Sequence, residues 1–285
     1  MRLFLLTSLT MIAFAGNSVL GRLALADGSM DAASYSFLRV VSAVVLLLAL
    51  VKLRYPARFS NIKRESNWAA ALALFGYVAG FSYAYQALDT GMGALILFSC
   101  VQAMMIGWGL YKGDRPGVLE WLGIAMAFGA FVFLMSPGLT APPLVASVIM
   151  GLAGVAWGVY SLLGKRATNP LLATTGNFTR VVPMVIALSL ISVLVVDTFT
   201  VTPFGVTMAV LSGAVTSALG YALWYQVLPL LTATRAAIVQ LTVPVLATFG
   251  GIVFAGEGLT LRFALCSAFI LLGIALSVLA KSKRS

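Results

Sequence analysis

The chain has 285 residues, of which 61% are hydrophobic and only 9% are charged, and its mean hydropathy is +1.04. Soluble domains are about 45–50% apolar and about 25% charged, so this composition excludes a water-soluble domain and a disordered chain. Lys and Arg outnumber Asp and Glu by 18 to 8, which gives a formal net charge of +10. In a membrane protein such an excess marks the loops on one side of the bilayer, and we expect no nucleic-acid partner.

The composition also excludes much catalytic chemistry. The chain contains no histidine, so it lacks an imidazole base and a histidine metal ligand. Its two cysteines, Cys100 and Cys266, lie far apart in apolar segments, and we expect both to be small core residues without a disulfide. We therefore expect no metal site, no cofactor and no enzymatic activity.

Ten apolar segments, each bounded by charged residues, Pro, Gly or polar clusters, cover 3–25, 32–52, 67–88, 92–111, 118–136, 144–164, 171–196, 204–228, 233–254 and 260–280. A membrane-spanning helix needs about 20 apolar residues. The first segment resembles a signal peptide as far as Ala15, but its apolar run continues to Leu25, so we expect a retained helix. The fold class is therefore an all-α integral membrane protein with ten transmembrane helices.

The basic residues predict the orientation of these helices. With ten spans, fourteen of the 18 Lys and Arg residues lie on the same side of the membrane as the N-terminus, whereas only Arg262 lies in a loop on the opposite side. Basic residues collect in cytoplasmic loops. We therefore expect a multi-pass protein of the bacterial inner membrane with both termini in the cytoplasm.

The two halves of the chain share four matching segments, in the same order and at offsets of 140 to 143 residues. These are AFAGNSVLGR at 13–22 and AWGVYSLLGK at 156–165, FLRVV at 37–41 and FTRVV at 178–182, Tyr85-Gln86 and Tyr225-Gln226, and Gly113-Asp114 and Gly256-Glu257. The pattern predicts two repeats, 1–140 and 141–285. Because each repeat has five helices, the second enters the membrane inverted, which is typical of secondary transporters with a site near the midplane.

These residues resemble the EamA-type drug/metabolite transporter superfamily. The resemblance rests on Gly-Asn-Ser-Val-Leu-Gly-Arg at 16–22, on an arginine in helices two and seven, on Leu-Thr-Val-Pro-Val-Leu at 241–246 and on Gly-Glu-Gly-Leu-Thr at 256–260. Ten-helix bacterial exporters of the YddG type look most similar. The resemblance implies export of amino acids, including apolar and aromatic ones, or of related metabolites by alternating access. One departure is that Pro244 of helix nine corresponds to Val101 in the first half.

Polar and aromatic residues inside the spans are the candidates for substrate binding, because an intramembrane polar group is costly unless it is paired or lines water. Gln102 and Asn17 lie well inside their helices and can bind a carboxylate or an ammonium group. Aromatic rings can cover an apolar side chain or hold a cation. The predicted substrate-binding residues are Asn17, Tyr83, Gln86, Gln102, Trp157 and Tyr160.

Four further residues receive a gating or structural role. Arg39 and Arg180 occupy matching places about two turns inside their helices. Each can bind a substrate carboxylate or pair with helix-end carbonyls or an acid, which for Arg39 is Asp31 or Asp89. Tyr225 and Gln226 are the repeat equivalents of the pair that ends the third helix. These matched pairs predict two gates on opposite faces.

Two other patterns concern packing. Gly76 with Gly80, and Gly154 with Gly158, have the spacing of close contacts between membrane helices. Trp68, Trp121 and Tyr111 lie at the ends of spans, where aromatic residues anchor a protein at the membrane interface.

The alternatives that the sequence leaves open are a broad drug/metabolite or nucleotide-sugar carrier, a membrane enzyme and a channel. An enzyme would need clustered acids, histidines or a metal site, and a channel would need a charged ring or a carbonyl filter. No Asp or Glu falls in the centre of a predicted span, so a central proton-coupling carboxylate is not expected. The expected partners are a small-molecule substrate and membrane lipid. The exact substrate, the coupling ion, the oligomeric state and the resting conformation stay open.

Overall fold

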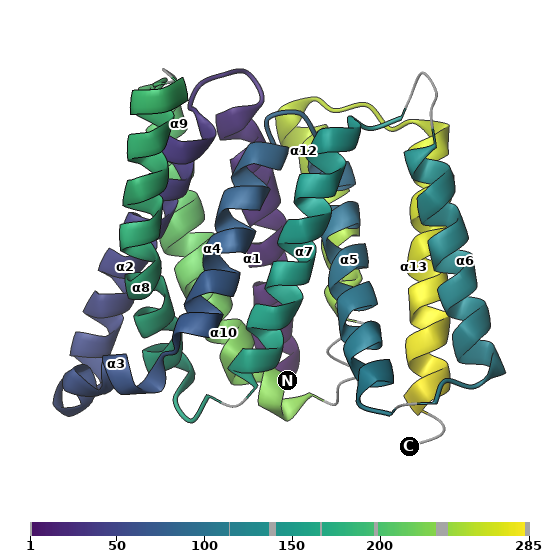
Figure 1. The fold of residues 1–285 in the computed structure, drawn as a ribbon, viewed down its shortest axis with the longest axis horizontal. Helices are drawn as coiled ribbons and strands as arrows, with labels where there is room; N and C mark the ends of the chain where they lie inside the picture. The colour runs from purple at the N-terminus through teal and green to yellow at the C-terminus, as the bar shows by residue number, and fades with distance from the viewer. Residues whose placement is uncertain are drawn as a thin grey trace.

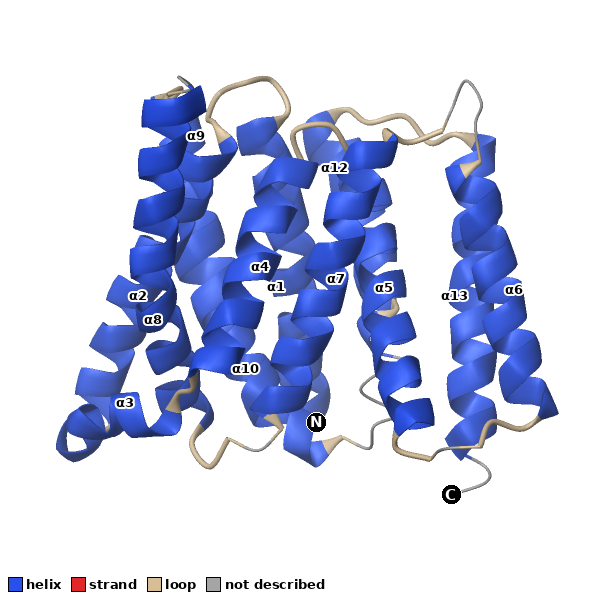
Figure 2. Ribbon diagram, viewed as in Figure 1, coloured by secondary structure: helices blue, strands red, loops and turns tan. Residues whose placement is uncertain are grey.

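A computed structural model describes residues 2–113, 115–136, 141–165, 167–196, 199–231 and 239–282. Within these ranges the secondary structure is helical, and the one β pairing is an isolated bridge between Met30 and Val201 (Figure 2). Eight of the described helical segments are long and apolar enough to cross a membrane, and two further apolar helices are shorter. The prediction of an all-α membrane protein with about ten helices is confirmed.

The helices follow the predicted spans. In the first half of the chain they are α1 (Arg2–Leu25), α2 (Ala32–Arg54), α4 (Trp68–Ala84), α5 (Thr90–Tyr111) and α6 (Val118–Met135). In the second half they are α7 (Leu144–Gly164), α8 (Pro170–Ile191), α9 (Pro203–Leu211), α10 (Gly220–Val227), α12 (Thr242–Ala255) and α13 (Leu261–Ser282). Between α9 and α10 the chain forms the π-helix η3 (Ser212–Leu219), so that these three elements make up the eighth span.

Local side-chain contacts fix where several helices begin and end. The Asp31 carboxylate accepts from the Ser34 N–H at 2.9 Å at the start of α2, and the Asn67 side chain accepts from the Ala70 N–H at 2.7 Å at the start of α4. Such caps satisfy backbone donors that the first turn leaves without partners. At the end of α12, Gly256 has a φ of 64°, a left-handed conformation that favours glycine.

The third span is shorter than predicted. It was expected to reach residue 88, but α4 ends at Ala84, because the N–H groups of Ala87 and Leu88 both return to the Ala84 carbonyl at 3.1 and 3.0 Å. These bonds close a tight turn before Asp89, and the next helix begins one residue later.

The predicted start of the ninth span, residue 233, lies outside the described part of the chain, and the described helix α12 begins at Thr242. The polar connection after α2 contains the short 3-10 helix η1 (Pro56–Asn61) and the single-turn α3 (Ile62–Glu65).

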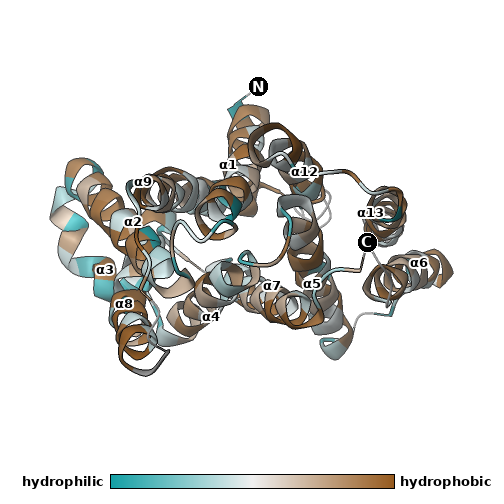
Figure 3. Cartoon of the chain, turned by 90° about the horizontal axis from the view of Figure 1, so that it is seen from above, coloured by the Kyte–Doolittle hydropathy of each residue, from teal (hydrophilic) through white to brown (hydrophobic). Residues whose placement is uncertain are grey.

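The spans form one bundle, and α1 begins at the same end of it as α13 finishes (Figure 1). α6 and α13 pack against each other and stand together at one side of the bundle, as the view from above also shows (Figures 1 and 3). Elsewhere α2 contacts α8, α5 contacts α12, and α7 packs against both α4 and α5. The contacts of α7 with α4 and α5 have counterparts at the corresponding positions of the predicted repeat, where α1 packs against the eighth span and α12.

Most of the helical chain consists of hydrophobic residues (Figure 3), and many large ones are exposed on the outside of the bundle. Large side chains such as Phe128, Leu152 and Phe249 are 67%, 66% and 65% exposed. Soluble monomers rarely expose contiguous apolar patches larger than a few hundred Å². A multi-pass membrane protein accounts for this surface, because its outward-facing side chains contact lipid.

Glycines allow the central helices to approach closely. A Cβ atom at Gly80 of α4 would lie 3.0 Å from the Ala153 Cβ of α7, and one at Gly154 of α7 would collide with the Leu97 carbonyl oxygen of α5. The predicted role of these glycines in helix packing is confirmed, since a side chain at Gly154 would collide with the backbone of α5.

Candidate functional site

A buried polar network at the centre of the bundle is built around Asn17 of α1. Its Oδ1 atom accepts hydrogen bonds from the hydroxyls of Ser212 at 2.6 Å and Thr216 at 3.1 Å, and its Nδ2 atom donates to the Tyr77 hydroxyl at 3.1 Å. The Tyr35 hydroxyl donates to Ser212 Oγ at 2.7 Å. The network therefore joins α1, α2 and α4 of the first half to η3 of the second half.

Arg39 of α2 lies beside this network and is completely buried. Its Nε donates to Ser217 Oγ at 2.9 Å, and its Nη2 donates to the hydroxyls of Tyr221 and Tyr77 at 2.8 and 3.2 Å. The guanidinium also lies 4.6 Å from the ring centroid of Phe81. All these partners are neutral, so the charge is stabilised by hydroxyl dipoles and aromatic faces.

An aromatic cluster surrounds the polar network. The ring of Tyr77 lies 4.9 Å from Trp157, Trp157 lies 4.7 Å from Tyr221, and Phe14 makes edge contacts with Trp157 and Trp224 at 5.5 and 5.8 Å. The space left among these rings is a cavity of about 10 Å³, which is roughly enough for one water molecule. The centre of the bundle is therefore closed in this structure.

The π-helix η3 supplies the hydroxyl groups that the second half contributes to the polar network. Ser212, Thr216 and Ser217 all bond to Asn17 or Arg39, and Tyr221 follows in the next turn. π-helical turns are rare and occur frequently at functional sites. We infer that this local widening of the eighth span brings several small hydroxyls to one centre.

Three of the predicted substrate-binding residues come together here. Asn17 and Trp157 are each 2% exposed and line the central cavity, and Tyr160 is fully buried with its ring 5.5 Å from Trp157. The predicted gating residue Tyr225 stacks on Tyr160 at 5.4 Å, and its hydroxyl donates to the Tyr160 carbonyl at 3.3 Å. Gln226 is half-buried beside it.

The other three predicted substrate-binding residues lie elsewhere. Tyr83 is 37% exposed on the outside of α4, and Gln86 is exposed in the turn that follows this helix. Gln102 is buried, but it lines a separate cavity of about 250 Å³ with Ser99 of α5 and Phe128 of α6. The structure therefore does not bring these three side chains to the centre.

The two arginines at matching repeat positions have different surroundings. Arg180 is only partly buried on α8, where its Nη2 donates to the Lys63 carbonyl at 2.9 Å and its guanidinium lies 5.1 Å from the Trp68 ring centroid. It supports the segment that contains α3 at one end of the bundle. Of the two arginines, Arg39 contacts the central cluster, and its described partners include neither of the suggested acids, Asp31 and Asp89.

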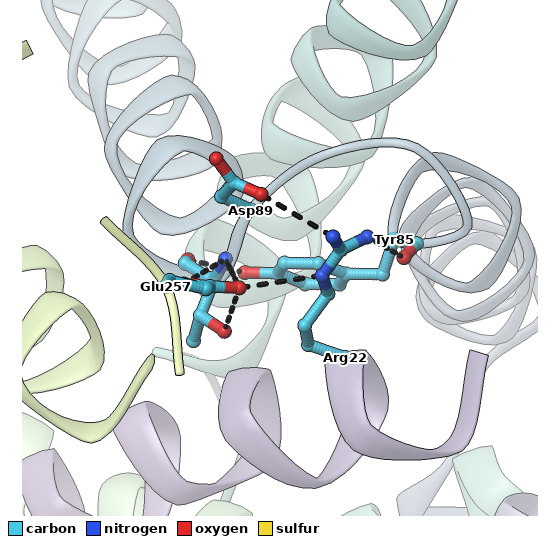
Figure 4. Close-up of polar contacts among 5 residues, drawn as sticks. Arg22, Tyr85, Asp89 and Glu257 are labelled. Carbon is cyan, nitrogen blue, oxygen red and sulfur yellow. Dashed lines mark hydrogen bonds and ion pairs between the residues drawn. The ribbon is translucent and has the colours of Figure 1, made fainter. Parts of the chain in front are cut away.

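A charged cluster lies at the end of the bundle opposite the N-terminus, where α1 finishes (Figures 1 and 4). Arg22 of α1 has its Nε 3.2 Å from Glu257, its Nη2 3.2 Å from Asp89, and its Nη1 3.3 Å from the Tyr85 carbonyl, to which it donates. Glu257 also accepts from the N–H of Thr90 at 2.8 Å and from its hydroxyl at 2.9 Å. A carboxylate is stabilised at a helix N-terminus, and here it joins the second half of the chain to the first.

Several residues of the central cluster were not among the site residues predicted from the sequence. These are Phe14, Tyr35, Tyr77, Tyr221 and the hydroxyl residues of η3, namely Ser212, Thr216 and Ser217. The spacing of polar residues in the eighth span was an available signal. The tyrosines carried none, because aromatic residues also face lipid in membrane helices.

The described residues contain no group of three or more Asp, Glu or Cys side chains that could hold a metal ion. What the central arrangement offers is a charged donor, several hydroxyls and a large aromatic surface between the two halves of the chain. Such a site is suited to bind a small molecule that has both a polar and an apolar part.

Comparisons with known proteins agree with this architecture. A model of the EamA-like transporter family matches residues 145–279, and the chain is 44% identical over 278 residues to uncharacterized protein PA1977 of Pseudomonas aeruginosa, covering 96% of this chain and 94% of that protein. A solved crystal structure with 18% identity matches 96% of this chain and 99% of its own, with a TM-score of 0.65, and so shares the fold. The chain belongs to the EamA-like transporters of the drug/metabolite transporter superfamily.

Proposed function

We propose that this protein is a secondary transporter that exports amino acids, including apolar and aromatic ones, or related small metabolites. It acts in the bacterial inner membrane with both termini in the cytoplasm, as the distribution of basic residues predicts. It has no enzymatic activity in this proposal. The proposal rests mainly on the central cluster, which joins α1 and α2 of the first half to η3 and α10 of the second.

The proposal includes two inverted repeats, 1–140 and 141–285, that rock against each other. The recurring helix contacts support this arrangement, because the packing of α7 on α4 and α5 has a counterpart in the packing of α1 on the eighth span and α12. A small relative rotation of the halves would enlarge the central cavity toward one face at a time. In this account Asn17, Trp157 and Tyr160 bind the substrate.

The charged cluster of Arg22, Asp89 and Glu257 acts as the gate at the end opposite the termini. The position of the cluster supports this role, because Glu257 follows α12 in the second half and contacts Arg22 of α1 and Thr90 of α5 in the first half. Tyr225, stacked on Tyr160, belongs to the opposite gate, as Gln226 does. Separation of the two halves at the end opposite the termini must break the contacts of Glu257 with Arg22 and Thr90, whereas Tyr160 and Tyr225 both belong to the second half and pack within it.

Uptake of labelled phenylalanine by liposomes that contain the purified protein tests this proposal. We expect uptake that saturates and is competed by unlabelled phenylalanine. Trp157→Ala is expected to reduce the initial rate roughly tenfold, because it removes a buried aromatic surface worth about 1.5–3 kcal/mol. Trp121→Ala is the matched control, because Trp121 is 50% exposed near the start of α6.

Two results would contradict the proposal. One is the absence of saturable flux for every amino acid tested, with saturable flux of dyes or nucleotide sugars instead. The other is an equal rate for the Trp157→Ala and Trp121→Ala proteins, since the central cluster would then play no part in transport.

A further inference from the structure

Several buried hydrogen-bond donors in the central cluster have no acceptor among the described residues. They are the Nη1 of Arg39, the Nε1 of Trp157 and the Nε1 of Trp224. Guanidinium and indole nitrogens are donors only. Most buried polar groups in proteins are hydrogen-bonded, so each exception calls for an explanation. Three donors without acceptors in one cluster indicate a ligand that supplies acceptors.

Ring contacts connect these three donors. Phe14 packs against both Trp157 and Trp224, and Trp157 packs against Tyr77 and Tyr221. Arg39 donates to the hydroxyls of the same two tyrosines, and these tyrosines line the central cavity. Arg39 therefore bonds two residues that line the cavity but is not itself one of the lining residues.

The charge of Arg39 is the second observation. The described ion pairs in this structure join Arg22 to Asp89 and Glu257. Arg22 lies in the last turn of α1, at one end of the bundle. Arg39 is 0% exposed, and its partners among the described residues are all neutral. Burial of an unpaired charge is costly, and a membrane adds no water to offset that cost. A bound anion would supply the missing charge.

We propose that the central cluster binds the carboxylate of a small organic acid, with Arg39 as its charged donor, the indole N–H groups as further donors and the aromatic rings around its apolar part. This inference rests on the proposed transport function and names its substrate class. Because the described residues of the cluster include no carboxylate to pair with an ammonium group, the anionic group is the required one and the amino group is dispensable.

The cavity must enlarge before such a ligand enters, because its present volume is only about 10 Å³. The Nη1 group of Arg39 has no acceptor among the described residues, so it can donate to a carboxylate while Nε stays bonded to Ser217. A second, parallel hydrogen bond from the guanidinium requires Nη2 to release one of the two tyrosine hydroxyls that it now bonds.

The first test uses the wild-type protein and three probes that share a phenyl group. Phenylalanine carries both charges, phenylacetate carries only the carboxylate, and phenylalaninamide carries only the ammonium group. Binding is measured by the change in tryptophan fluorescence of the purified protein. We expect phenylacetate to bind as tightly as phenylalanine, and phenylalaninamide to bind roughly tenfold more weakly or worse, as the loss of a charged hydrogen bond predicts.

Two variants test the assignment to Arg39. Arg39→Gln removes the charge, and Asn17→Asp keeps the acceptors for Ser212 and Thr216 but adds a carboxylate that Tyr77 connects to Arg39. Both are expected to weaken phenylacetate binding roughly tenfold or more, and Asn17→Asp does so while the hydroxyl network stays paired. Arg58→Gln, which changes an exposed arginine in η1, is the charge-matched control.

The outcomes separate this inference from the proposed function. Equal binding of phenylalaninamide and phenylacetate, or unchanged phenylacetate binding in a folded Asn17→Asp protein, overturns the inference even if transport is observed. Binding of phenylacetate that depends on Arg39 without any flux in liposomes supports the inference and overturns the proposed transport function.

Discussion

Replacement of Gly154 by valine is expected to lower the ratio of folded to unfolded protein by roughly 10- to 100-fold. A Cβ atom at this position would collide with the Leu97 carbonyl oxygen and lie 2.9 Å from the Cys100 Cβ, so α7 and α5 would have to move apart. Overpacking of this kind costs about 1–3 kcal/mol, and each 1.4 kcal/mol is a factor of ten. The effect is measured as a loss of monodisperse, thermally stable protein in detergent.

Gly129→Val provides the control for this prediction. Gly129 lies in α6, and a Cβ atom there meets nothing within 4 Å. Both variants add the same β-branched side chain to a helix, so their intrinsic effects on helix formation are equal. An equal loss of stability in the two variants would contradict the close packing of α7 on α5.

Removal of the Glu257 side chain has the second large expected effect. In a Glu257→Ala protein, Arg22 loses the ion pair at 3.2 Å and the Thr90 N–H and hydroxyl lose their acceptor. Hydrogen bonds to charged groups contribute about 1.5–3 kcal/mol, so the equilibrium between the closed and open gate is expected to shift roughly 10- to 100-fold toward the open state.

A cysteine at position 18 reports this opening, because Ser18 lines the central cavity. In a background with alanine at positions 100 and 266, Ser18→Cys is expected to react severalfold faster with a hydrophilic maleimide when Glu257 is replaced. Asp89→Ala is the comparison, since the Asp89 side chain is 61% exposed and exposed ion pairs contribute about 0–1 kcal/mol. Equal labelling of the Glu257→Ala protein and its parent would show that this cluster does not hold the end closed.

The sequence predicted the spans well, because the length of an apolar run and the polar residues at its ends carry that information. Asp31 and Asn67 begin their helices as caps, and the predicted packing glycines Gly80 and Gly154 lie at helix contacts. The exception at Ala84 depends on a hydrogen-bonded turn, which hydropathy does not reveal.

The sequence predicted the site only in part, for a physical reason. Asn17 is a rare polar group in an apolar span, and it lies at the centre. Gln102 is equally rare but faces a different cavity, and Tyr83 faces outward. Because lipid and protein interior are both apolar, the pattern along α4 and α5 does not distinguish their inner face from their outer face.

The asymmetry between Arg39 and Arg180 was also absent from the sequence pattern. The two positions match in the repeat, but α3 lies against α8 and gives Arg180 a carbonyl partner near the surface. The π-helix of η3 gives Arg39 its hydroxyl partners in the interior. Such differences arise from tertiary packing, which a comparison of two five-residue segments does not contain.

The central claim is that the halves of this protein alternate around a closed central site. Counterflow tests it most directly: liposomes that contain the protein and are preloaded with unlabelled phenylalanine are diluted into a trace of labelled phenylalanine. An alternating-access carrier is expected to accumulate label transiently above its external concentration, because exchange through one site couples inward to outward movement. Label that only equilibrates, without any overshoot, would contradict the account and indicate a continuous pore or no transport of this substrate.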